Sequence, residues 1–195
     1  MTEITRHHAE WAVVDRFRSM LNEVPHSEYN VTQSYGLCVA ILAWVMQRIR
    51  THEEATNSQE DKTAIALKTL LDLQMVESLP WGLKTNAPPG SKTAHSDFIN
   101  FSAFDFLKWL RDASCHGDAR KITPVNDNGE LIGFHFQMTA RDNIQRALLL
   151  TEKDLRRIGS SLADMYCKAL QSVATSHPAT FIEDARSMRE ERRVV

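Results

Sequence analysis

Apolar residues recur at intervals of three or four along most of the chain, the spacing that places side chains on one face of an α-helix. The first such stretch predicts a helix over residues 4–23, and the second predicts a helix that begins near Gln33. This second helix contains ten consecutive apolar residues, 37–46, which are too few to span a bilayer and too uniform to form a one-sided face. We therefore expect it to be the buried centre of a helical bundle.

Two more helices are expected on either side of a proline-rich break. The polar residues 51–62 predict a solvated loop or a frayed helix end, and a third helix follows over residues 62–77. Its contact face consists of Ala64, Leu67, Leu71 and Met75. Trp81, at the start of the break, is expected to be a buried ring that pins one end of the loop. Ser96 or Asp97 is expected to cap a fourth helix that carries Phe98, Phe101, Phe104 and Phe106.

Beyond Gly117 the apolar pattern changes from a helical period to alternation. Residues 121–125 and 130–136 flank the turn sequence 126–129 and predict a β-hairpin, and residues 147–150 suggest a third short strand. Thr151 and Asp154 then have the spacing of a capping box, which predicts the start of the last helix. The inward face of that helix is expected to be Leu155, Ile158, Leu162, Met165 and Ala169. The pattern as a whole predicts one mainly α domain over residues 1–176, followed by a charged tail over residues 177–195.

Composition excludes several classes of protein. The formal net charge is −2, so the chain lacks the global positive field that dominates non-specific nucleic-acid binding, and any contact with RNA would need a local patch. Three cysteines with no C-x-x-C spacing are expected to be reduced thiols of a cytoplasmic protein rather than disulfides or a zinc site. The first residues lack a basic segment leading into an apolar run, so no signal peptide is expected, and no segment predicts a membrane span.

The residues with candidate chemistry lie in one short stretch, 106–117, which ends in Arg111-Asp-Ala-Ser-Cys-His116-Gly117. Phe106, Leu110 and Ala113 share a buried helical face in this stretch, and Gly117 is the residue type that ends helices. Arg111 and His116 are five positions apart, which is about 140° on an ideal helix, so the two side chains of one chain cannot both point squarely at one substrate atom. Either the last turn unwinds at Gly117, or a second copy of the chain completes the site across a two-fold axis.

The segment Arg111-Asp112-Ala-Ser-Cys-His116 resembles the R-x4-6-H signature of the HEPN superfamily (higher eukaryotes and prokaryotes nucleotide-binding). The flanking segments are similar to its plasmid-borne and abortive-infection branch, and the likeness covers residues 97–170. The resemblance implies a HEPN-like bundle of about five helices with a small β-hairpin inserted after the motif helix. It also implies a homodimer with its site at the interface, and metal-independent cleavage of RNA by Arg111 and His116. A toxin or phage-defence effector, with a possible antitoxin partner, is the corresponding biological role.

Chemistry supports these roles for the motif residues. RNA carries its own nucleophile, the 2′-OH, so the protein needs only a base and a cation that grips the phosphate. A histidine near neutral pKa and the fixed fork of an arginine suit those tasks, so His116 and Arg111 are the candidate catalytic residues. Asp112, four residues before His116, would orient the imidazole ring. No cofactor is expected.

Several alternatives stay open for these and the neighbouring residues. His116 and Asp112 would equally form a surface pair that caps a helix, and a catalytically silent HEPN module that binds a nucleotide, an antitoxin or another protein is the alternative function. Lys108, Arg120 and Lys121 are candidates for a local RNA-binding patch. His7, His8 and Glu10 lack a partner cluster for a metal. Cys115 points about 100° away from His116, so no thiol–imidazole dyad is expected and Cys115 should be half-buried. Ser34 and Tyr35 are further polar candidates for the site.

Overall fold

The computed structural model describes residues 9–23, 29–53, 59–78, 80–83, 98, 100–115, 122–139 and 143–174. This part of the chain is mainly helical, with five helices and a small antiparallel sheet of strand order β1-β2-β3. The elements are α1 (Ala9–Asn22), α2 (Asn30–Glu53), α3 (Gln59–Asp72), α4 (Ala103–Cys115), β1 (Ile122–Asp127), β2 (Glu130–Thr139), β3 (Gln145–Thr151) and α5 (Glu152–Ala174). The predicted mainly α class and the hairpin after the motif helix are confirmed. The expected tail, residues 177–195, lies outside the described residues.

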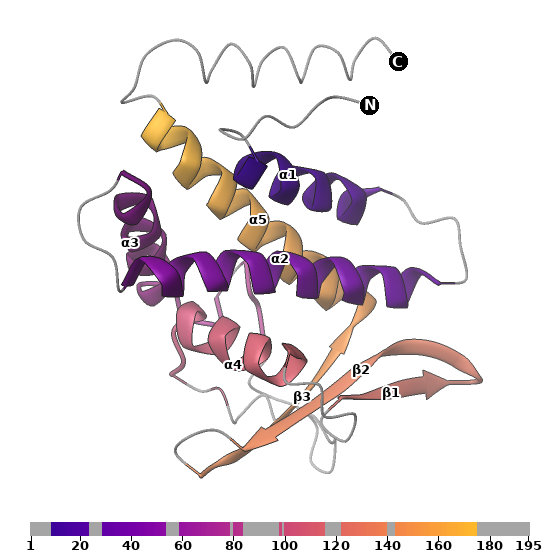
Figure 1. The fold of residues 1–195 in the computed structure, drawn as a ribbon. Helices are drawn as coiled ribbons and strands as arrows, with labels where there is room; N and C mark the ends of the chain where they lie inside the picture. Colours follow the sequence, from indigo (N-terminus) through magenta and orange to yellow (C-terminus); the bar gives the residue numbers. More distant parts are fainter. Residues whose placement is uncertain are drawn as a thin grey trace, which may run out of the picture.

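Helix α2 is the centre of the molecule, as the apolar run predicts. It contacts all four other helices and β2, and Figure 1 shows it across the middle, with α1 above it, α4 and the sheet below it, and α5 crossing it diagonally. Ile41, Leu42 and Val45 are fully buried. Trp44 within the same run is exposed, however, so the expectation of a helix buried all round is wrong at that position. The helix also begins earlier than predicted, at Asn30.

The ends of α3 and α4 differ from the prediction. Helix α3 ends at Asp72 rather than at residue 77, and Met75 is exposed in an isolated bridge to Ser102 instead of extending the contact face. Helix α4 begins after Ser102, whose Oγ accepts the backbone N–H of Asp105 and donates to its carboxylate, each at 3.1 Å. Asn100 has a φ of 65°, which breaks any helix starting near residue 97. Phe98 therefore precedes the helix, while Ser96 and Asp97 lie outside the description.

Trp81, at the start of the proline-rich break, is a buried ring, as predicted. The indole ring is completely buried, and its Nε1–H donates to Gln74 Oε1 at 2.8 Å. The aromatic cluster beside α4 is built around Phe98, whose ring meets the rings of Phe106 and Trp109 edge-on at centroid distances of 5.5 and 4.7 Å. Through these contacts, the side of α4 away from Arg111 packs against aromatic rings.

The hairpin forms where the turn sequence predicts it. Asn128 and Gly129 have φ values of 49° and 86°, the paired positive angles of a tight type I′ turn. Strand β3 is longer than the predicted residues 147–150, and β2 lies between its two neighbours. A Cβ on Gly133 of β2 would lie 2.3 Å from the carbonyl oxygen of Leu150, so only glycine fits this point of the β2–β3 ladder.

Helix α5 starts and packs as predicted. The backbone N–H of Thr151 donates to Asp154 Oδ2 at 3.2 Å, and the N–H of Asp154 donates back to Thr151 Oγ1 at 3.4 Å, which is the reciprocal capping box. Of the predicted inward face, Leu155, Ile158 and Leu162 are fully buried, and Met165 and Ala169 are partly buried against the core.

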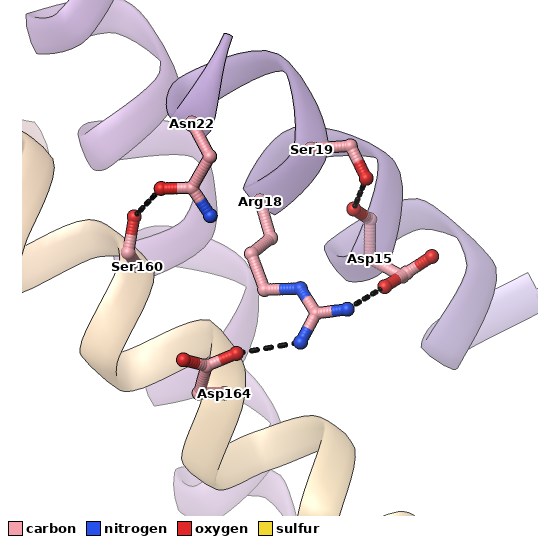
Figure 2. Close-up of polar contacts among 6 residues, drawn as sticks. All are labelled: Asp15, Arg18, Ser19, Asn22, Ser160 and Asp164. Carbon is pink, nitrogen blue, oxygen red and sulfur yellow. Dashed lines mark hydrogen bonds and ion pairs between the residues drawn. The ribbon is translucent and has the colours of Figure 1, made fainter.

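Polar contacts join α5 to α1 (Figure 2). Arg18 of α1 lies between two carboxylates, contacting Asp164 of α5 at 2.5 Å and Asp15 of its own helix. Ser160 Oγ donates to Asn22 Oδ1 at 2.7 Å one turn further along. We call Arg18, Asp15 and Asp164 the α1–α5 clasp, because it ties the first described helix to the last.

Candidate functional site at the end of helix α4

The motif helix presents its polar residues on the side opposite its apolar support. Phe106, Leu110 and Ala113 are buried, as the spacing predicts, and they fix α4 against α2 and the sheet. Arg111 and Asp112 lie on the last turn and are both partly exposed. Lys108, three residues earlier, is exposed about 60° around the helix from Arg111. The structure thus brings Lys108 and Arg111 to one side of α4, while Arg120 and Lys121 lie outside the described residues.

Arg111 is held half-buried by its surroundings. Its side chain is 16 % exposed, and its Nη2 contacts Asp112 Oδ1 at 3.1 Å, a carboxylate whose side chain is 28 % exposed. The Arg111 Nε is buried and has no hydrogen-bond partner within the described part of the chain. Because an unmade hydrogen bond of a buried donor costs about 1–3 kcal/mol, this N–H is a donor that an incoming acceptor would satisfy.

Asp112 contacts Arg111, the residue before it. The sequence predicts that its carboxylate orients the ring of His116, one turn ahead, and the structure shows the contact with Arg111. The long side chain of Arg111 reaches its neighbour, although adjacent helical residues point about 100° apart. His116 lies outside the described residues, so its contact with Asp112 stays a prediction.

Cys115 completes the exposed side of the last turn. The structure places it at the surface rather than half-buried, which corrects the expectation from sequence. Burial of the thiol itself still raises the pKa of Cys115, and the adjacent charge of Arg111 opposes this while Asp112 adds to it.

Tyr35 of α2 joins the same corner of the molecule. Burial raises the pKa of its hydroxyl first, and the nearby thiols of Cys115 and Cys38 raise it further. The Tyr35 ring packs on Phe134 of β2 with a centroid distance of 4.5 Å and an interplanar angle of 37°. Because Tyr35 and Phe134 are far apart in the sequence, no spacing of residues predicts their contact. The only sequence feature that points to Tyr35 as a site residue is its position among the polar residues at the start of an otherwise apolar helix. Ser34, the other candidate there, is buried.

The corner is thus formed by three elements that pack against one another, α2, α4 and β2. It contains a half-buried cation, a carboxylate, a thiol and an aromatic pair. Among the described residues, no group of three or more His, Cys, Asp or Glu side chains is arranged to hold a metal ion. His7 and His8 are not among those residues. An arrangement of this kind can bind an anion through Arg111 and a flat ring through Tyr35 and Phe134.

Comparisons with family models, with curated proteins and with solved structures find no match for this chain. Over the ranges that the structure describes, no helix is both long enough and apolar enough to cross a membrane.

Proposed function

We propose that the protein is a metal-independent endoribonuclease of HEPN type, and that the 2′-OH of the RNA is the nucleophile in the cleavage. The observation that carries the proposal is Arg111, a half-buried arginine whose Nε lacks an acceptor among the described residues and which stands five residues before His116. Folding leaves such a donor unsatisfied at a stability cost, which is reasonable where a substrate phosphate supplies the acceptor. A toxin or phage-defence effector acting on cellular RNA is the role that the HEPN likeness favours.

In the proposed reaction, His116 removes the proton from a ribose 2′-OH, and the oxygen attacks the adjacent phosphorus. The bond from phosphorus to the 5′ oxygen breaks, and that oxygen leaves with the bonding electrons and takes a proton from solvent. Arg111 grips the phosphate oxygens as negative charge builds on them. The products are a 2′,3′-cyclic phosphate and a 5′-hydroxyl.

The proposed active form is a homodimer whose interface includes α4, because Arg111 and His116 are about 140° apart on an ideal helix and a second copy can supply the missing half of the site. Exposed apolar side chains on and just after α3 support this choice. Ile65 and Leu70 lie on α3, and Leu73, one residue past its end, is 77 % exposed. Helix α3 lies beside α4, with Lys68 Nζ placed 4.8 Å from the centroid of the Phe104 ring. A two-fold interface around α4 would cover these side chains and remove them from water.

A second candidate is a silent HEPN-like module that binds a nucleotide, an antitoxin or another protein. The Arg111–Asp112 contact favours it, because a guanidinium already paired with a carboxylate is partly neutralised before any phosphate arrives. The net charge of −2 also weakens non-specific attraction to RNA. Cleavage distinguishes the two candidates.

The decisive experiment incubates the purified protein with total RNA in EDTA. We expect cleavage by the native chain and by Lys168→Ala, which removes an exposed cation on α5, and none by the Arg111→Ala, His116→Ala double variant. Arg111→Lys should also fail, because lysine lacks the paired donors. A substrate with a 2′-deoxy sugar at the cut site should resist. Normal cutting of that substrate, or activity that returns only with magnesium, would show that water is the nucleophile and that the mechanism is wrong.

A further inference from the structure

The Tyr35–Phe134 ring pair lies between the core and the surface. Both side chains are partly buried and pack against the edge of the apolar core. Across the sheet, Phe134 is aligned with the buried Leu150 on one side and with the exposed Pro124 on the other. Ile132, two residues along the same face of β2, is exposed as well. The partly buried ring pair therefore lies between the buried Leu150 and the exposed Pro124 and Ile132.

The ring pair and the candidate cation lie on elements that pack against one another. Helix α4, which carries Arg111, contacts both α2, which carries Tyr35, and β2, which carries Phe134. Cys115 follows Arg111 by one helical turn, about 6 Å along the axis of α4, and its charge contributes to the raised pKa of Tyr35. The aromatic pair and the guanidinium therefore belong to the same corner of the molecule.

From this geometry we infer that Tyr35 and Phe134 form a stacking platform for one unpaired base of an RNA strand whose phosphate is held by Arg111. The inference rests on the proposed function for its ligand, and it specifies the substrate class as single-stranded. Stacking on an aromatic side chain tolerates every base, because each base has a π face. Bases inside a duplex are already stacked on their neighbours and cannot reach the platform without being unpaired. Loops and unpaired ends are the expected targets.

Binding can be measured apart from cleavage with a strand that lacks the nucleophile. A fluorescein-labelled 2′-O-methyl RNA of about twelve nucleotides cannot be cut through a 2′-OH, so fluorescence anisotropy reports affinity on the active protein. Tyr35→Leu and Phe134→Leu should each weaken binding by about 5- to 100-fold, the usual effect of losing one stacked base. Tyr35→Phe, which keeps the ring, should bind like the native chain. Tyr29→Leu, which removes an exposed tyrosine just before α2, is the matched control and should have no effect.

A second oligonucleotide separates stacking from loss of fold. In this strand the bases are replaced by abasic 2′-O-methyl sugars, so the phosphates remain. The native protein should bind it more weakly than the base-bearing strand, whereas Tyr35→Leu should bind both strands alike. Thermal unfolding of each variant confirms that it is folded, and Phe134→Tyr retains a ring if Phe134→Leu does not fold.

The results also distinguish this inference from the function on which it rests. If the native chain cleaves RNA but Tyr35→Leu and Phe134→Leu bind as tightly as the native chain, the platform is wrong and the ribonuclease stands. The platform is also wrong if the native chain binds neither strand, or binds both equally. If binding depends on the bases and on Tyr35 but RNA is never cut, the platform stands on a silent module.

Discussion

Two half-buried arginines should respond in opposite directions to the same substitution. Arg111 has one carboxylate contact and a buried Nε with no partner in the described part of the chain. Arg18, in the α1–α5 clasp, lies between two carboxylates (Figure 2). Replacing either residue by methionine keeps an apolar stem of similar reach and removes the charged group. The comparison therefore separates an arginine that stabilises the fold from one retained at a cost in stability.

The exposed fractions of the partners set the expected magnitudes. The Asp15 side chain is only 6 % exposed, that of Asp164 is 46 % exposed and that of Arg18 is 23 % exposed. Removing the cation from a nearly buried carboxylate costs several kcal/mol, while a half-exposed pair contributes about 0.5–1 kcal/mol. We expect Arg18→Met to lower the free energy of unfolding by about 2–4 kcal/mol.

For Arg111→Met the contributions nearly cancel or change sign. Losing the Asp112 contact, between groups that are 16 % and 28 % exposed, costs about 0.5–1 kcal/mol. Removing the buried unpartnered Nε gains about 1–3 kcal/mol. The free energy of unfolding should therefore stay the same or rise by up to about 2 kcal/mol, and under the proposed function RNA cleavage should be lost.

Urea unfolding followed by circular dichroism at neutral pH measures both variants, with the midpoints compared at a common slope. If Arg111→Met destabilises the protein as much as Arg18→Met does, the guanidinium of Arg111 is satisfied in the folded chain. Its unpaired donor could then no longer be used to argue for a ligand.

Three further predictions concern other parts of the molecule. Cys115 should be the only cysteine of the described residues to react with Ellman's reagent in the native protein. Because burial raises the pKa of Cys115, its reaction rate should rise at a higher pH than that of a free cysteine. Burial raises the pKa of Cys38 to about 12, so a fast reaction at Cys38 would contradict the structure. Leu73→Glu should weaken the proposed homodimer by about 10- to 100-fold in light scattering, since burying one leucine contributes about 1.5–3 kcal/mol, and unchanged association would place the interface elsewhere. Gly159→Ala should destabilise the protein by about 0.5–2 kcal/mol, because the new Cβ would lie 2.6 Å from a neighbouring side chain. Gly36→Ala, which has open space around it, should instead stabilise the protein by about 0.5–1 kcal/mol. Thermal unfolding measures both variants, and equal effects would refute the close packing of α5.

Local chemistry explains which elements could be predicted from sequence. The start of α5 follows from Thr151 and Asp154, which bond to each other across three residues, and the hairpin turn follows from Asn128 and Gly129. The start of α4 could not be predicted in the same way. Its aromatic spacing continues upstream through Phe98, but a left-handed residue at position 100 interrupts the helix, and apolar periodicity does not report backbone conformation.

The candidate site was only partly predictable, because its members come from distant parts of the chain. The face that buries Phe106, Leu110 and Ala113 follows from their spacing and leaves Arg111 on the opposite side. The partner of Tyr35 is a strand residue 99 positions later (134 − 35), and that pairing depends on how the sheet packs under α2. Helical geometry predicts that Asp112 lies on the same side as His116. It does not predict that the flexible side chain of Arg111 reaches the neighbouring carboxylate.

The contact between Arg111 and Asp112 therefore has two consequences for the proposed chemistry. While the pair is intact, the carboxylate lowers the positive potential that a phosphate meets, by an amount comparable with a half-exposed ion pair, about 0.5–1 kcal/mol. A phosphate can offer two oxygens to the guanidinium fork, including one for the unsatisfied Nε, so it competes with a single carboxylate contact on favourable terms. A carboxylate released from Arg111 is available to His116, one turn ahead in the sequence, where it favours the protonated imidazole. Under the proposed function, phosphate binding and orientation of the base are then coupled through one side chain, and Asp112→Asn would uncouple them by strengthening RNA binding while slowing cleavage.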